Sequence, residues 1–91
     1  MNHVLITTEH RGVFFGELSE DQDRAAKTLT LKNCRNIIMW SGKKGFLGLA
    51  AHGPEEGSRI GAAAPSVLLH GVTSVSECTS DATRVLTSWT A

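Results

Sequence analysis

Two short runs of β-branched, aliphatic and aromatic residues lie close together near the start of the sequence, and their spacing constrains the fold more than any other feature. They are residues 3–9 (HVLITTE) and 13–18 (VFFGEL). The three residues between them end in Gly12, which supplies the positive φ that a tight turn needs. The sequence therefore begins with a predicted β-hairpin.

Two further runs predict strands in the middle of the chain. Residues 27–32 (KTLTLK) alternate polar and apolar side chains with a period of two, which is typical of a strand with one buried face. Residues 34–40 (CRNIIMW) form a short apolar run rich in β-branched side chains, which favours a second strand. Residues 32–34 would form a bulge or tight turn between them. The polar segment 19–23 is predicted to be a solvated loop.

The last third of the chain is more varied. Residues 66–78 (SVLLHGVTSVSEC) predict one long strand with a glycine bend, or two strands. Residues 59–64 are ambiguous, and Pro65 would confine a strand there to an edge or an end.

Two short helices complete the prediction. Residues 46–52 allow about two helical turns before Gly53 and Pro54 stop them. Thr79 or Ser80 can cap a C-terminal amphipathic helix. Its apolar positions recur at helical spacing and are Ala82, Val85, Leu86 and Trp89. The expected fold is α+β and mainly β, a curled antiparallel sheet or small open barrel of about five or six strands with two short helices.

Length and charge limit the function classes. A chain of 91 residues predicts a single domain spanning 1–91. Nine basic side chains balance nine acidic ones, so net charge does not mark a general nucleic-acid or membrane binder. We expect a cytoplasmic protein, because the N-terminal sequence has no secretory leader and no apolar run is long enough to span a membrane. We also expect a homo-oligomer, because so small a domain has a thin stability margin.

Several motifs resemble those of a family of short bacteriophage and prophage proteins of unknown function. The most specific are GVFFG at 12–16 and the block that runs from NCR at 33–35 to WSG at 40–42. The similarity covers most of residues 4–86. Thr7 stands where an arginine is common in that family; if that arginine contacts a ligand in the relatives, this chain must do without the contact or use Arg11 for it. The resemblance implies a phage origin, a host-cell location and a fold rather than a reaction.

Charge is distributed unevenly along the chain. Residues 24–54 carry six cationic side chains and no acidic one. Six like charges repel each other unless an acidic segment or an anionic ligand neutralises them. We weigh two interpretations, a phosphate-binding patch and a solvated strand face. In the second, Arg24, Lys27 and Lys32 pair with acidic residues at Glu17, Glu20 and Asp21.

The segment WSGKKG at 40–45 is the strongest candidate ligand site. A glycine-flanked turn exposes backbone N–H groups, the lysines add charge, and an indole offers a face on which a purine can stack. The alternative is that Trp40 anchors the core at a strand end while the lysines keep a turn soluble. The predicted ligand-binding residues are Arg11, Arg35, Trp40, Ser41, Gly42, Lys43 and Lys44.

Catalytic and metal sites are not predicted. The four histidines and two cysteines lack any metal-ligand spacing. Cys34 with His70 is conceivable as a nucleophilic pair, but only the adjacent Arg35 favours it, by lowering the thiol pKa. Cys34 and Cys78 are expected to be buried small apolar residues rather than a disulfide.

These observations favour a non-enzymatic binding protein without cofactor. We expect a counter-defence factor that sequesters an anionic nucleotide signal. Two alternatives remain open, an inhibitor or adaptor that binds a host protein through Trp40, Phe46 and Trp89, and a single-stranded nucleic-acid binder, which the zero net charge disfavours.

Overall fold

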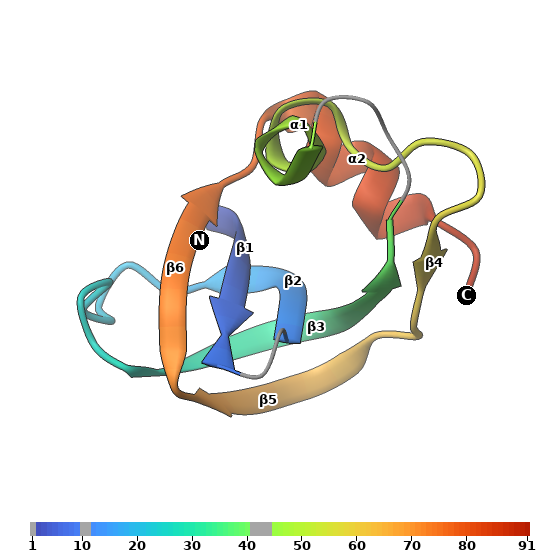
Figure 1. The fold of residues 1–91 in the computed structure, drawn as a ribbon. Coiled ribbons are helices and arrows are strands. Elements are labelled where there is room, and N and C mark those ends of the chain that lie inside the picture. Colours follow the sequence, from blue (N-terminus) through green and yellow to red (C-terminus); the bar gives the residue numbers. More distant parts are fainter. Residues whose placement is uncertain (1, 10–11, 41–44) are drawn as a thin grey trace.

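The protein folds as a curled antiparallel sheet with two short helices, as the sequence predicts (Figure 1). This computed structural model describes residues 2–9, 12–40 and 45–91. The elements are β1 (Asn2–Thr8), β2 (Gly12–Leu18), β3 (Thr28–Met39), α1 (Gly45–His52), β4 (Arg59–Ile60), β5 (Ala64–His70), β6 (Val72–Glu77) and α2 (Ser80–Ser88). Helices α1 and α2 lie together over one side of the sheet (Figure 1).

The sheet is open and antiparallel, with the strand order β4-β3-β2-β1-β6. The predicted hairpin is β1 with β2, and its register places Leu5 opposite Phe15. Strand β5 pairs with β3 while β6 pairs with β1. These two strands therefore lie at opposite ends of the β1–β2–β3 meander, and the sheet curls because a short bend joins them.

The bend between β5 and β6 lies at Gly71, whose φ is 67°. Of the two predicted forms, the structure has two strands. The carbonyl oxygen of Gly71 accepts a hydrogen bond from the Glu9 N–H at 2.9 Å. The Val72 N–H donates to Lys27 O at 2.9 Å. Strand β5 begins at Ala64, two residues earlier than expected, and Pro65 lies near its start. The ambiguous segment forms only the two-residue β4.

Strand β3 is one continuous strand, whereas the sequence predicts two strands at 27–32 and 34–40. It continues because β5 pairs across the irregular position, with Lys32 opposite Ser66 and Cys34 opposite Ala64. The expected bulge is present, since Asn33 has φ 50° and the register with β2 shifts there. Gly16 lies against this bulge, where an added Cβ would come within 3.0 Å of Lys32 O.

The bulge changes which face of β3 is buried. Before it, Leu29 and Leu31 belong to a cluster inside the curl of the sheet. After it, Arg35 and Ile37 are buried on the side that faces the helices. One extra residue in a strand moves the following side chains to the opposite face.

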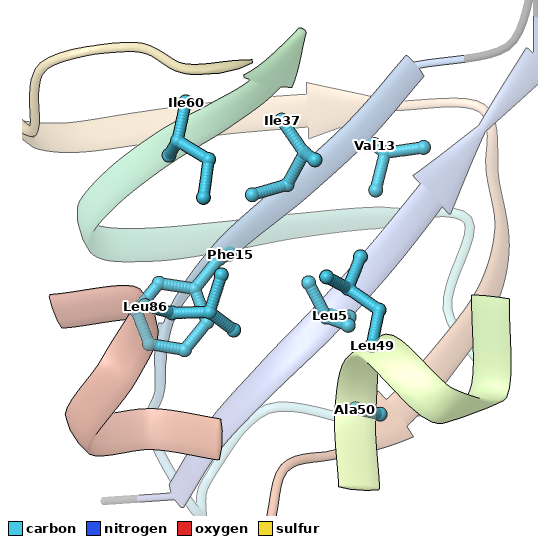
Figure 2. Packing of buried hydrophobic residues seen from close by; sticks show 8 residues of the cluster. All are labelled: Leu5, Val13, Phe15, Ile37, Leu49, Ala50, Ile60 and Leu86. Atoms are coloured by element: carbon cyan, nitrogen blue, oxygen red, sulfur yellow. The ribbon is translucent and has the colours of Figure 1, made fainter. Parts of the chain in front are cut away.

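Two hydrophobic clusters result. The helix-side cluster lies between the sheet and the two helices (Figure 2) and consists of Leu5, Val13, Phe15, Ile37, Leu49, Ala50, Ile60 and Leu86. The inner cluster lies inside the curl and consists of Val4, Ile6, Leu18, Leu29, Leu31, Cys34 and Leu69. Both faces of the β1–β2 hairpin are therefore buried.

The helices begin and end close to the predicted residues. Helix α1 ends at His52, and Gly53 follows with φ 84°. Thr79 caps α2, because its hydroxyl accepts a hydrogen bond from the Ala82 N–H at 3.1 Å. The same hydroxyl donates to Ala51 O at 2.6 Å, which ties the start of α2 to α1. No helix formed by the described residues is long and apolar enough to cross a membrane.

The predicted loop at 19–23 is present and exposes Glu20, Asp21 and Asp23, but the wider segment 19–27 is also anchored to the sheet. The Gln22 side chain accepts from the Thr30 N–H at 2.8 Å and donates to Thr30 O at 2.9 Å, as a neighbouring strand would. Ala26 packs against the inner cluster. The Gln22 side chain thus supplies hydrogen-bond partners for the Thr30 N–H and C=O groups, which lie in the part of β3 that extends beyond β2.

Candidate functional site: the α2–β1 groove

Arg35 is the only predicted site residue that is both described and buried, with 6% of its surface exposed. The bulge at Asn33 places it opposite Phe15, beneath the last turn of α2. Its Nε donates to Gly61 O at 2.7 Å, and its Nη1 donates to Leu86 O at 2.8 Å and to Thr87 O at 3.4 Å.

These contacts compensate the buried charge of Arg35. Desolvation lowers the pKa of the guanidinium. Within the described residues no carboxylate forms an ion pair with it. The carbonyl groups at the end of α2 carry partial negative charge and supply the compensation instead. Arg35 is therefore a buried cation held by neutral acceptors.

Trp40 lies half-buried at the end of β3 and packs against the helix-side cluster. Its ring meets that of Phe46 edge-on, with centroids 6.2 Å apart and an interplanar angle of 69°. This is the position expected of a core anchor at a strand end. The other predicted site residues, Arg11, Ser41, Gly42, Lys43 and Lys44, lie outside the described residues.

A narrow pocket of about 140 Å³ lies beside Arg35. It is lined by His3, Phe15, Glu17, Asn33, Arg35, Ala63 and Thr87. The His3 ring stacks on that of Phe15, with centroids 5.5 Å apart and an angle of 19° between planes. A carboxylate oxygen of Glu17 accepts a hydrogen bond from Asn33 Nδ2. The pocket thus brings together an imidazole, a carboxylate, an amide and a guanidinium.

The hairpin register explains why these side chains meet. His3 lies directly opposite Glu17, and Phe15 lies opposite Arg35. Because side chains two residues apart share a face, His3 and Glu17 extend the row that begins with Leu5 and Phe15 in the helix-side cluster. The narrow pocket therefore lies at the rim of that cluster.

A wider pocket of about 500 Å³ adjoins the narrow one. It is lined by Asn2, His3, Glu77, Cys78, Ser80, Thr83 and Arg84. His3 lines both pockets, and Thr83 and Thr87 lie one helical turn apart on α2. We call the two pockets together the α2–β1 groove.

Two ion pairs flank the wide pocket. Glu77 pairs with Arg24 at 3.3 Å, and Arg84 pairs with Asp81 at 3.7 Å. The sequence predicted that Arg24 would pair with Glu17, Glu20 or Asp21, and this is wrong for Arg24. Segment 19–27 brings it to β6 instead. Lys27 and Lys32 form no ion pair with any described residue.

The thiols are not reactive groups. Both cysteines are free, as expected. Burial raises the pKa of Cys34 to about 11 and that of Cys78 to about 12, so both stay protonated at neutral pH. The adjacent Arg35 does not lower the pKa of Cys34, as a nucleophile would require. Cys34 lies opposite Ala64 at one end of β5, whereas His70 lies opposite Thr28 at the other. The described residues contain no group of three potential metal ligands.

Comparison with known protein families places the chain. Residues 1–86 match the family described as a domain of unknown function, DUF6948. The chain belongs to this family. No curated protein and no solved structure matches it. The expected resemblance to a family of proteins of unknown function is thus confirmed, in that the chain belongs to an uncharacterised family.

Of the residues that line the groove in this DUF6948 chain, the sequence had singled out Arg35 and missed its neighbours. His3 and Glu17 look like ordinary strand residues until the hairpin register pairs them. Asn33 carried a usable signal, because asparagine tolerates positive φ and stood where the strand pattern broke. The contribution of Thr83 and Thr87 depends on how α2 docks, which local patterns do not reveal.

Proposed function

We propose that this DUF6948 protein is a small non-catalytic binding protein that holds an anionic nucleotide in the α2–β1 groove. The observation that carries the proposal is Arg35, a residue with only 6% of its surface exposed, which lines a pocket and has no carboxylate partner among the described residues. Such a group favours a ligand that brings an electron-rich oxygen or nitrogen to it.

The dimensions of the groove support a small-molecule ligand. Ligand pockets in proteins typically measure about 300–1,000 Å³. The wide pocket of about 500 Å³ falls in this range, and the narrow pocket of about 140 Å³ adds a side chamber. A nucleotide has a matching shape, since it joins a compact ring system to a polar sugar and phosphate.

The charges around the wide pocket support an anionic group there. The carboxylate of Glu77 is already paired with Arg24 at 3.3 Å. Arg84 is paired with Asp81 only weakly, at 3.7 Å between two highly exposed side chains, and such a pair exchanges readily for a better partner. The first turn of α2 adds the positive end of the helix dipole at Ser80.

A binding role rather than a catalytic one is supported by the state of the reactive groups. Both thiols have raised pKa values and are poor nucleophiles. The two carboxylates that line the groove are engaged, Glu17 with Asn33 and Glu77 with Arg24. We extend the proposal to sequestration of a nucleotide signal by a phage protein, on the strength of the motif resemblance.

Titration calorimetry and native mass spectrometry test the proposal. The probes are nucleoside mono- and diphosphates, cyclic di- and trinucleotides and ADP-ribose. We expect at least one to bind, with the subunit number and any co-purified anion read from the native spectrum. Thr83→Trp fills the wide pocket and should abolish this binding, while Thr90→Trp, at an exposed position outside the groove, should not. Heat no greater than dilution across the whole panel would refute the proposal.

A second candidate is an inhibitor or adaptor that binds a host protein. It is favoured by large apolar side chains that are exposed in the described part of the chain, among them Ile38 (58%), Met39 (50%), Leu47 (71%) and Leu68 (56%). Affinity capture from host lysate separates the candidates, because a nucleotide-binding protein should retain a small anionic molecule and an inhibitor should retain a polypeptide.

A further inference from the structure

We infer that the narrow pocket receives the base of the nucleotide, of the guanine type, while the phosphate lies in the wide pocket. This inference rests on the proposed function and adds the orientation and the class of the ligand. It follows from the side chains that share the narrow pocket, above all Arg35 and Glu17.

Glu17 argues against a phosphate in the narrow pocket. Its carboxylate lines the same space of about 140 Å³ as the Arg35 guanidinium. A phosphate that reached Arg35 would bring its negative charge into the same small pocket as this carboxylate, and like charges that close together disfavour binding. A neutral group that accepts from Arg35 and donates to Glu17 has no such penalty.

The edge of a guanine base has this complementary pattern. Its O6 is an acceptor suited to arginine, and its adjacent N1–H and N2–H groups are two donors suited to a carboxylate. Arg35 uses Nε and Nη1 for main-chain carbonyls, and no described residue accepts a hydrogen bond from its Nη2. The Glu17 carboxylate takes one hydrogen bond from Asn33 and keeps further acceptor positions.

The rest of the groove suits the other parts of the ligand. The stacked rings of His3 and Phe15 line the narrow pocket and offer an aromatic boundary to a planar base. His3 also lines the wide pocket, where the hydroxyls of Ser80 and Thr83 and the guanidinium of Arg84 lie. These groups donate hydrogen bonds to a sugar phosphate, and Arg84 can exchange its weak partner for it.

Calorimetric titration of the purified full chain with four probes tests this orientation. The probes are GMP, AMP, 1-methyl-GMP, in which the base edge is blocked, and ribose 5-phosphate, which has no base. GMP should bind at least about tenfold more tightly than each of the other three, since one lost base-edge pair is worth about a factor of ten.

Two variant pairs locate the effect. Glu17→Gln should weaken GMP about tenfold, whereas Glu20→Gln, the same change at an exposed position outside the groove, should leave it unchanged. Ala63→Phe should fill the narrow pocket and remove the preference for GMP over ribose 5-phosphate, while Ala62→Phe at the neighbouring exposed position should not. The Ala63 pair keeps the test valid if the Glu17 variant folds poorly.

The outcomes separate this inference from the proposed function. If no nucleotide of the wider panel binds, the proposed function fails and the inference with it. If a nucleotide binds but ribose 5-phosphate or 1-methyl-GMP binds as tightly as GMP, or Ala63→Phe leaves the preference intact, the groove remains a binding site and the base-in orientation is overturned. If AMP binds as tightly as GMP, the guanine class of the base is overturned.

Discussion

Replacing Arg35 by methionine removes the link between β3 and the end of α2. The guanidinium donates to Gly61 O and Leu86 O at 2.7 and 2.8 Å and to Thr87 O at 3.4 Å. Methionine fills a similar volume without a donor. The Leu86 residue is fully buried, so its carbonyl oxygen loses its Arg35 partner inside the protein, whereas the exposed Thr87 and half-exposed Gly61 can regain water.

The expected cost follows from these differences. A buried acceptor left without a partner costs about 1–3 kcal/mol. Loss of a cation at a helix C-terminus costs up to about 2 kcal/mol in a partly buried setting. Relief of the desolvated charge offsets part of this. We expect the free energy of unfolding to fall by about 2–4 kcal/mol, which for a domain of this size lowers Tm by roughly 10–20 °C.

Urea and thermal unfolding followed by circular dichroism measure this loss. Arg59→Met makes the same substitution at an exposed position of β4 and should change stability by less than about 0.5 kcal/mol. Arg35→Lys keeps the charge but not the fork of donors and should lie between the wild type and Arg35→Met. If Arg35→Met is no less stable than Arg59→Met, the Arg35 contacts do not hold α2 and the reasoning is refuted.

Three other predictions concern the bulge, the helix cap and the thiols. Gly16→Ala should lower the free energy of unfolding in urea by about 1–3 kcal/mol, because the new Cβ would meet Leu31 Cβ and Lys32 O at 3.0 Å. An unchanged free energy of unfolding would show that β2 and β3 separate there without strain. Thr79→Ala should lower the free energy of unfolding by about 1 kcal/mol or somewhat more, because the Thr79 hydroxyl both caps α2 and donates to Ala51 O. Thr90→Ala is the control, and equal stabilities of the two variants would contradict the assigned cap. Burial raises the pKa of Cys34 from 9.0 to about 11 and that of Cys78 from 9.0 to about 12. The stability gained by burying the two thiols in their neutral form is therefore complete below pH 9 and is lost as the pH rises through the folded-state values. Thiol labelling of the native protein at neutral pH should therefore be slow compared with labelling of the unfolded chain, and equal rates would show that the thiols are not buried.

Much of the fold is readable from local patterns. The β1–β2 hairpin follows from two short runs and a glycine between them, and α2 follows from helical spacing after Thr79. The bulge at Asn33 was also visible. Local patterns could not show whether the strand ends at Asn33, where the alternation of polar and apolar residues is interrupted. Strand β3 continues there because β5, more than thirty residues later in the sequence, pairs with it on both sides of Asn33.

The groove was much less predictable than the fold. The sequence pointed to a cationic loop next to Trp40, since charge and glycine content are local properties. The α2–β1 groove depends instead on three non-local facts, the hairpin register, the change of face at the Asn33 bulge and the docking of α2. Arg35 was singled out for its charge alone, and its contacts with Gly61, Leu86 and Thr87 lie 26 to 52 residues away in the sequence.

Two-dimensional ¹H–¹⁵N NMR of the protein during titration with GMP tests the central claim most directly. We predict the largest shifts for the backbone amides of His3, Glu17 and Thr87 and for the Nε–H signal of Arg35, with saturation at one ligand per groove. Shifts confined to residues around Trp40 would contradict the assignment of the groove, and the absence of any shift at millimolar GMP would contradict the placement of a guanine base in the narrow pocket.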